Sequence, residues 1–250
     1  MLFGIHPVLE AITADRRQVE RVLLGNRQAS RRFDEIVAAA EARRIPVDRM
    51  APEALSDLAG SDDHQGVCAR VGAYPWATLE ELLSAPPVTG SGHVLLLLDQ
   101  VVDPHNLGAA ARTALSLGVD GILLPRDRSA GPTPAACKAS AGALEHLRVA
   151  HVTNMAQTVD TLKTHGLWVF GLDADAPAVI YEADLRGPLA VVVGGEERGI
   201  RPLVKRHCDA LLSIPRCGPV PSLNASVAGA VAMYEAFRQR RTGRLWAGER

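Results

Sequence analysis

Residues 94–112 read VLLLLDQVVDPHNLGAAAR, and this stretch decides the fold. The apolar run at 94–98 leaves no polar face, which is typical of a strand buried on both sides in a parallel sheet. Asp103 and Pro104 predict a turn, and Asn106 is placed to cap a helix over 106–117. A strand that leads directly into a helix indicates an α/β unit.

The same alternation continues along the C-terminal part of the chain. Apolar runs at 121–124, 167–171 and 189–193 predict further buried strands, and 134–144 predicts an Ala-rich helix between them. We therefore expect an α/β fold with a parallel sheet over 93–250. Because parallel sheets bind ligands at the carboxyl ends of their strands, functional residues should follow Leu98, Leu124 and Val193.

The first 72 residues form a separate unit in which short helices and strands alternate. Helices are predicted over 7–14, 29–44 and 52–59, and strands over 19–24, from Ile45 onwards and over 66–71. This pattern predicts a small α/β/α sandwich. Three prolines and a Gly-Ser-Gly run at 90–92 predict that regular structure stops over 73–92, which we interpret as a linker.

The composition bounds the class of protein. The 250 residues are 47% hydrophobic and 22% charged, and 27 Lys+Arg against 28 Asp+Glu give a net charge of −1. This excludes a disordered chain, a collagen and a disulfide scaffold, and no global positive field indicates a nucleic-acid partner. Lys138, Lys163 and Lys205 are the only lysines, so arginine is in excess, through either codon bias or phosphate recognition.

The sequence offers neither a targeting segment nor a metal motif. Residues 1–12 lack the basic start and apolar stretch of a signal peptide, and no apolar run reaches the roughly 18–20 residues that span a bilayer. We therefore expect a cytoplasmic protein without membrane contact. The four cysteines form no C-x-x-C pair and predict buried thiols. His207, Cys208 and Cys217 match no common zinc spacing, so no metal is expected.

Two further stretches carry candidate site residues. Residues 189–202 read LAVVVGGEERGIRP, a strand that leads into a Gly-rich turn containing the carboxylate of Glu196. The dinucleotide pattern G-x-G-x-x-G fails at position 196, which counts against an oxidoreductase that uses a nicotinamide cofactor. Residues 211–226 predict a rigid Pro-rich loop, and Ser222 or Asn224 then caps a helix over 225–240. The small residues of this helix favour core packing or a dimer contact.

Together the three stretches resemble the motifs of the SpoU (TrmH-like) branch of the SPOUT methyltransferases. The resemblance rests on DPHNLGAAAR at 103–112, VVVGGEERGI at 191–200 and IPRCGPVPSLNASVAGAVAMYE at 214–235. FGIHPVLEAI at 3–12, HQGVCARV at 64–71 and PRDRSAGPTPAACKASAGALEHL at 125–147 are similar to the subgroup that 2′-O-methylates a guanosine of 23S rRNA. The resemblance covers nearly the whole chain.

The resemblance implies a fold, an activity and a set of site residues. The fold is a C-terminal parallel sheet with a deep trefoil knot over 93–250 and an N-terminal RNA-binding domain over 1–72, similar to ribosomal protein L30e. The activity is methyl transfer from S-adenosylmethionine to a ribose 2′-hydroxyl of 23S rRNA by a homodimer that pairs through the C-terminal helix. By motif position, the catalytic residues are Asn106, Arg112, Glu196, Ser222 and Asn224. The cofactor-binding residues are Gly194, Gly195, Gly199, Ile214, Ser222 and Leu223.

The resemblance makes Arg112 the residue that activates the hydroxyl group. A guanidinium has no acceptor and is not a base, so we expect Arg112 to bind the target phosphate and polarise the 2′-oxygen. Glu196, Ser222 and Asn224 are expected to order the surrounding hydrogen bonds.

RNA contact is expected from local basic patches, because the chain has no bulk positive charge. The predicted RNA-binding residues are Arg16, Arg17, Arg31, Arg32, Arg44, Arg126, Arg128 and Lys138. The chain departs from the family pattern at Glu197, where many members have glycine, and at Arg216-Cys217, where small or apolar residues are frequent. The cations expected to offset the charge of Glu197 are Arg198, Arg201, Lys205 and Arg206.

Three alternatives stay open at this point. The target is a guanosine of 23S rRNA or another nucleotide of rRNA or tRNA. The RNA is free rRNA or an assembling large-subunit particle. The protein is an active enzyme or a catalytically silent rRNA-binding assembly factor that keeps the fold.

Overall fold

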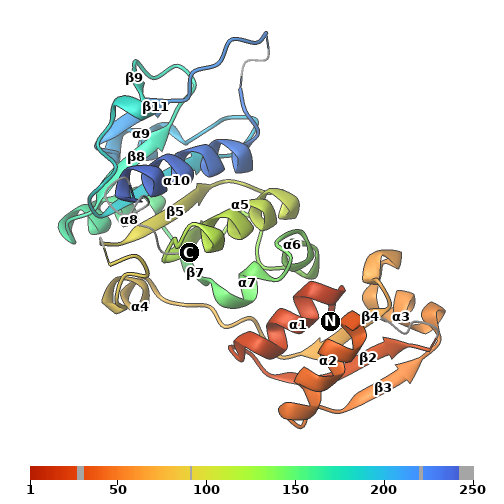
Figure 1. Ribbon diagram of the computed structural model, residues 1–250. Coiled ribbons are helices and arrows are strands. Elements are labelled where there is room, and N and C mark those ends of the chain that lie inside the picture. Colours follow the sequence, from red (N-terminus) through yellow and green to blue (C-terminus); the bar gives the residue numbers. More distant parts are fainter. Residues whose placement is uncertain (27–30, 91, 220–221, 242–250) are drawn as a thin grey trace.

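The computed structural model describes residues 1–26, 31–90, 92–219 and 222–241, which form two α/β domains (Figure 1). The predicted helix start at Ala29 and residue 91 of the predicted linker lie outside the described residues. The N-terminal domain consists of β1 (Leu2–Phe3), α1 (Ile5–Ala14), β2 (Val19–Gly25), α2 (Arg31–Ala42), β3 (Val47–Met50), α3 (Pro52–Ala59), the 3-10 helix η1 (Asp62–His64) and β4 (Val67–Val71).

The N-terminal sheet has the strand order β1-β4-β2-β3. β4 is antiparallel to both β1 and β2, whereas β2 and β3 are parallel. Val8 and Ile12 of α1 and Ile36 of α2 are buried in one hydrophobic cluster, and Leu55 of α3 packs with Leu23 of β2 in another. Helices on both faces of the sheet give the expected α/β/α arrangement.

The C-terminal domain is built on seven strands with helices on both faces. Its elements are β5 (Val94–Asp99), α5 (Pro104–Ser116), β6 (Gly121–Pro125), α6 (Pro134–Ala139), α7 (Ala143–His146), β7 (Arg148–Val152), α8 (Met155–Thr164), β8 (Trp168–Leu172), β9 (Ala178–Val179), the 3-10 helix η2 (Ile180–Glu182), β10 (Leu189–Gly194), α9 (Pro202–His207), β11 (Ala210–Ser213) and α10 (Ala225–Arg241). The strand order is β7-β6-β5-β10-β8-β11-β9, and every neighbouring pair is parallel, which confirms the predicted fold class.

The register of the central strands brings the motif-bearing loops together. β10 lies between β5 and β8, with Leu189 beside Val94 and Gly194 beside Asp99. Asp99 and Gly194 therefore end adjacent strands at the same edge of the sheet. This is the edge at which parallel sheets bind their ligands.

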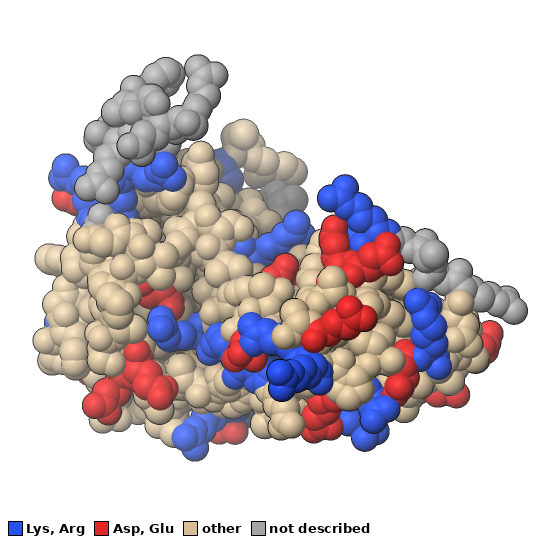
Figure 2. Space-filling model, turned by 60° about the horizontal axis from the view of Figure 1, so that its bottom comes forward, with Lys and Arg blue, Asp and Glu red and all other residues tan. Residues whose placement is uncertain are grey.

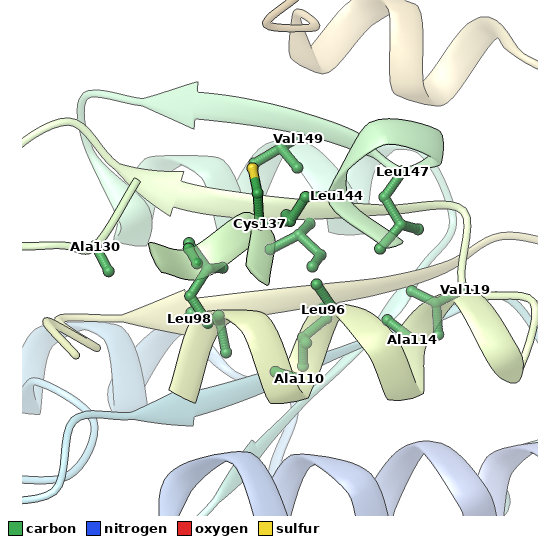
Figure 3. Close-up of a cluster of buried hydrophobic side chains, with 14 of the residues drawn as sticks. Leu96, Leu98, Ala110, Ala114, Val119, Ala130, Cys137, Leu144, Leu147 and Val149 are labelled. Carbon is green, nitrogen blue, oxygen red and sulfur yellow. The ribbon is translucent and has the colours of Figure 1, made fainter. Parts of the chain in front are cut away.

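The apolar run of β5 serves both faces of the sheet. Leu96 and Leu98 belong to the cluster that contains α5, and Figure 3 shows them beside Ala110 and Ala114. Leu95 and Leu97 belong to the cluster formed by α8 and α9 on the other face. Burial of one leucine side chain contributes roughly 1.5–3 kcal/mol, so a run buried on both faces anchors the sheet.

Residues 73–92 contain a helix, so the prediction that regular structure stops throughout this segment is wrong. α4 (Leu79–Ser84) begins with a capping box made by Thr78 and Glu81. Leu82 is buried against the sheet, and the N–H of Ala77 donates to the carbonyl oxygen of Val149 at 2.9 Å. The prolines flank this helix and do not interrupt it.

Two arginines that were predicted to bind RNA instead hold the domains together. Arg17 Nη2 forms an ion pair of 2.6 Å with Glu145 Oε1, and the side chains are only 7% and 1% exposed. Arg16 donates to the backbone carbonyls of Leu147 and Pro75. These contacts occupy both guanidinium groups, contrary to the prediction from the sequence.

Other differences concern helices and short strands. The predicted helix over 134–144 is interrupted between α6 and α7, where Ala141 and Gly142 have φ values of 50° and 87°. β7, α8, α9 and β11 were not predicted, because their short apolar segments do not distinguish a strand from a helix. Within the described ranges, no helix has the length and apolar character needed to span a membrane.

Candidate active site

The Gly-rich turn after β10 is folded tightly against the loop that follows β5. A Cβ on Gly194 would lie 2.0 Å from the carbonyl carbon of Gly199, and one on Gly195 would lie 2.3 Å from the carbonyl oxygen of Gln100. The N–H of Gly195 donates to the carbonyl oxygen of Asp99 at 2.9 Å, and that of Gly199 donates to Gly195 at 2.8 Å. Only glycine fits at positions 194 and 195, since the contacting atoms belong to the backbone.

A buried carboxylate joins the two loops. The carboxylate of Asp99 accepts the backbone N–H of Arg201 at 2.9 Å and the side-chain Nε of Arg201 at 2.8 Å. It also forms an ion pair with Nη2 of Arg201 at 2.6 Å. Lys205 Nζ donates a hydrogen bond to Asp173 Oδ2 and forms an ion pair with it. Two of the four cations expected to offset the charge of Glu197 are therefore engaged elsewhere, and that part of the prediction is wrong.

Three polar side chains from the three motifs meet at this edge. Glu196 Oε1 accepts Asn106 Nδ2 at 2.6 Å and Asn224 Nδ2 at 2.8 Å, and Asn224 Nδ2 also donates to Asn106 Oδ1 at 2.9 Å. We call this set the Asn-Glu-Asn network. Asn106 is not the helix cap that was predicted, because Asp103 Oδ1 caps α5 by accepting the N–H of His105 at 2.8 Å.

Asn224 is held in one orientation by the start of α10. Its Oδ1 accepts the N–H of Ser226 at 2.9 Å, the hydroxyl of Ser226 at 2.6 Å and the N–H of Val227 at 3.3 Å. The acceptor end of the amide is thereby used as a helix cap, so the donor end faces Glu196. In the described part of the chain, Ser222 forms no hydrogen bond with this network.

An inner cavity of about 290 Å³ opens at the carboxyl ends of β8, β10 and β11. All the residues predicted to bind the cofactor line it: Gly194, Gly195, Gly199, Ile214, Ser222 and Leu223. Asp173 and Lys205 also line it and were missed, although Asp173 directly follows the apolar run of β8. The hydrogen bond from Lys205 lowers the pKa of Asp173, which keeps this carboxylate ionised.

An outer cavity of about 410 Å³ lies on the other side of the Gly-rich turn. Asn106, Glu196 and the exposed Arg128 line it, together with Gln100 and Val101 at the end of β5. Both cavities are lined by Gly195, Glu196, Arg198 and Gly199, so Glu196 lies in their common wall. Glu196 thus borders two spaces that each have room for a ligand.

Arg112, like Ser222, is a catalytic candidate that the structure does not bring into the network. It lies within α5, exposed, and lines an apolar groove of about 620 Å³ with Tyr181, Ile214, Val231 and Tyr234. Ile214 also lines the inner cavity, so the groove and that cavity are neighbours. Arg112 therefore lies on the side of the inner cavity that faces the groove.

The small residues of α10 face inward. Ala225, Gly229 and Ala232 are buried within the chain, and a Cβ on Gly229 would lie 3.4 Å from Val193 Cγ2. The side of α10 that stays exposed carries the larger Tyr234, which is 59% exposed. Core packing therefore accounts for these three small residues.

The remaining basic candidates differ in their surroundings. Arg31, Arg32, Arg44, Arg126 and Arg128 are exposed. Lys138 instead bridges the domains, 3.6 Å from Asp63 Oδ2. Figure 2 shows Lys and Arg interspersed with Asp and Glu over one face, without a continuous basic field.

Cys68 and Cys137 are buried as predicted, whereas Cys217 is exposed, contrary to prediction.

The chain matches two family models that together span most of its length. The SpoU rRNA methylase family model matches residues 93–234. The chain belongs to the SpoU rRNA methylase family. A model for the substrate-binding domain of RNA 2′-O ribose methyltransferases matches residues 1–77 of this SpoU protein. Family membership confirms the resemblance found in the motifs and excludes the nicotinamide oxidoreductase.

Relatives and solved structures agree with this assignment. The SpoU chain is 41% identical to the 23S rRNA (guanosine-2′-O-)-methyltransferase RlmB of Ralstonia nicotianae, over 96% of each chain. An uncharacterized tRNA/rRNA methyltransferase of Synechocystis sp. is 39% identical over 96% of this chain, which spans 62% of that relative. The crystal structure of the SpoU methyltransferase AviRb from Streptomyces viridochromogenes is 25% identical, with a TM-score of 0.81, over 97% of this chain and 90% of AviRb.

Proposed function

We propose that this SpoU protein transfers the methyl group of S-adenosylmethionine to the 2′-hydroxyl of a guanosine in 23S rRNA. The observation that carries the proposal is the wall that the two cavities share, where Glu196 lies and accepts hydrogen bonds from Asn106 and Asn224. The inner cavity is proposed to hold the cofactor and the outer cavity the ribose. The name of the Ralstonia relative supports the choice of nucleotide.

The lining of the inner cavity fits S-adenosylmethionine. Ile214 and Leu223 offer apolar surface to an adenine ring, and the backbone of the Gly-rich turn offers N–H and C=O groups. Asp173 suits a hydroxyl or ammonium group, and Lys205 suits a carboxylate. Bound there, S-adenosylmethionine supplies an electrophilic methyl group on its sulfonium.

The residues of the network are proposed to orient and deprotonate the ribose hydroxyl. Glu196 Oε1 accepts both amide donors, and among the described residues Glu196 Oε2 has no hydrogen-bond partner. We assign Oε2 as the acceptor of the 2′-hydroxyl proton, while the oxygen–methyl bond would form and the sulfur–methyl bond would break to leave a neutral thioether. Asn106 and Asn224 hold the carboxylate in place, and positioning of this kind supplies much of a methyl-transfer rate. Ser222, which lines the inner cavity, is proposed to contact the cofactor.

The proposed role of Arg112 is to bind the phosphate of the target nucleotide. It is exposed, and no ion pair engages it within the described residues. A guanidinium offers donors and positive charge but no acceptor, so Arg112 is proposed to act by its charge and not as a base. Arg31, Arg32, Arg44, Arg126 and Arg128 are proposed as further phosphate contacts, since all are exposed.

A homodimer through α10 is part of the proposal. The apolar groove that contains Tyr181, Val231 and Tyr234 presents large exposed side chains on one face. A second copy of the chain would cover these side chains and enclose the neighbouring inner cavity.

The trefoil knot stays a proposal as well, and it would link the segment after β11 to the cofactor cavity. An rRNA substrate favours a cytoplasmic enzyme.

Mapping of 2′-O-methyl groups tests the proposed function. The protein is incubated with methyl-labelled S-adenosylmethionine and either free 23S rRNA or large-subunit assembly intermediates, and modified nucleotides are located by resistance of the backbone to alkaline cleavage. We expect one new resistant guanosine. Binding of RNA without methylation would favour the silent assembly factor, and a methyl group on a base would refute ribose chemistry.

A further inference from the structure

Trp76 forms an exposed aromatic stack at the junction of the two domains. Its indole lies on the imidazole of His151, with ring centroids 3.5 Å apart and an angle of 27° between the planes. Tyr74 packs edge-on against the indole at 5.3 Å. Trp76 still has 39% of its surface exposed. We call Trp76 and His151 the Trp-His stack.

The segment that carries the indole is fixed to the edge of the sheet. Ala77 forms a parallel bridge beside β7, through its N–H to the carbonyl oxygen of Val149 at 2.9 Å. The hydroxyl of Tyr74 donates to the carbonyl oxygen of Leu144 at 2.7 Å. The ring of Trp76 is therefore presented on a rigid segment, which reduces the entropy lost when a ligand packs on it.

The surroundings of the stack are basic. Arg126 follows β6 directly, and its N–H donates to the carbonyl oxygen of Val152 at 3.0 Å. Burial and the nearby charge of Arg126 lower the pKa of His151, which favours the neutral imidazole. Arg126 and Arg128 are exposed and form no ion pair with any described residue, and Asp127 lies between them in sequence.

One loop connects the stack to the candidate active site. A Cβ on Gly131 would lie 3.9 Å from Cη2 of Trp76. Earlier in the same loop, Arg128 lines the outer cavity with Asn106 and Glu196. The loop over 126–131 therefore approaches the stack through Gly131 and lines the outer cavity through Arg128.

We infer that Trp76 is a stacking platform for an unpaired base of the substrate RNA, and that Arg126 binds the adjoining phosphate. Proteins that bind single-stranded RNA combine an aromatic face with basic side chains along the backbone path, which is the arrangement found here. The platform would hold a nucleotide other than the one that is methylated. The inference rests on the proposed function, because it takes RNA as the ligand of the outer cavity.

Substitution of Trp76 tests the platform through RNA affinity. Loss of one base-stacking contact weakens binding by about 5- to 150-fold, so Trp76→Ala should raise the Kd for an RNA hairpin with unpaired bases by this factor. Trp76→Phe keeps a stacking ring and should recover most of the affinity. The matched control is Trp168→Ala, because Trp168 is 61% exposed on β8 and lies outside the proposed RNA surface. A fully paired duplex should bind all four proteins alike.

The kinetic and fluorescence results distinguish a platform from a structural role. Trp76→Ala should raise KM for RNA and leave kcat at saturating RNA and the affinity for S-adenosylmethionine unchanged. In a Trp168→Phe, Trp246→Phe variant, Trp76 is the one tryptophan left, and its emission should be quenched by the hairpin. Unchanged hairpin affinity in Trp76→Ala, or unquenched emission during binding, would overturn the inference.

The two proposals fail separately in this experiment. If the unmodified protein methylates no RNA but Trp76→Ala still weakens hairpin binding, the proposed function fails and the platform stands. If methylation proceeds and Trp76→Ala binds the hairpin as tightly as the unmodified protein does, the platform fails and the proposed function stands.

Discussion

The buried ion pair between the domains gives a prediction whose size follows from the structure. Arg17 Nη2 lies 2.6 Å from Glu145 Oε1, with 7% and 1% of the two side chains exposed. Arg17→Met keeps most of the apolar length of the side chain and removes its charge. Glu145 is then left as a buried carboxylate without its partner, which costs roughly 3–5 kcal/mol of folding free energy.

Urea denaturation monitored by circular dichroism measures this loss. A double variant, Arg17→Met with Glu145→Gln, removes both charges and should recover much of the lost free energy of unfolding, since no buried charge remains. Arg31→Met is the matched control, because the Arg31–Glu35 pair is exposed and such pairs contribute little.

The pH dependence of the loss has a defined sign. Burial raises the pKa of Glu145, and the charge of Arg17 opposes that rise. In Arg17→Met the pKa of Glu145 in the folded state rises further, because the charge of Arg17 is gone. The stability penalty is absent at a pH where Glu145 is protonated in both the folded and the unfolded state. It grows as the pH rises through the folded-state pKa. The difference in stability from the unmodified protein should therefore be larger at pH 8 than at pH 5. A pH-independent difference, or a single variant as stable as the double variant, would refute this reasoning.

Two other substitutions test the site and the assembly. Gly194→Ala would place a Cβ 2.0 Å from the carbonyl carbon of Gly199 and so distort the Gly-rich turn. The affinity for S-adenosylmethionine, measured by calorimetry, should fall by more than about tenfold. The control is Gly187→Ala, which should bind normally because a Cβ at position 187 has no atom within 4 Å. Tyr234→Asp adds a charge to the exposed face of α10, so sedimentation equilibrium should report a monomer. The control Leu58→Asp, on α3, should stay dimeric. A dimeric Tyr234→Asp variant would place the contact elsewhere.

The parallel sheet and the location of the site could be predicted from local sequence. The run at 94–98 is apolar at every position, which is typical of a strand covered on both faces. Because such strands present their carboxyl ends at one edge, Asn106 and Glu196 could be expected near each other, and their side chains are hydrogen-bonded. Asn224 joins them because the cap of α10 lies at the same edge.

Features that depend on contacts distant in sequence could not be predicted. The sequence of Arg16 and Arg17 is that of an exposed basic pair, and their burial depends on α7, more than a hundred residues later in the chain. In the same way, the sequence does not reveal that Leu82 packs on the sheet or that the small residues of α10 face inward. Pairing partners, unlike periodicity, are a property of the folded chain.

A single-turnover measurement of 2′-O-methyl formation by Glu196→Gln tests the central claim most directly. Glutamine can still accept the amide hydrogens of Asn106 and Asn224 but cannot take the proton of the ribose hydroxyl. We predict that the chemical step slows by about 10²- to 10⁴-fold, with affinity for S-adenosylmethionine and RNA retained, while Glu197→Gln keeps the normal rate. A Glu196→Gln enzyme that methylates 23S rRNA at the rate of the unmodified protein would contradict the role assigned to the network.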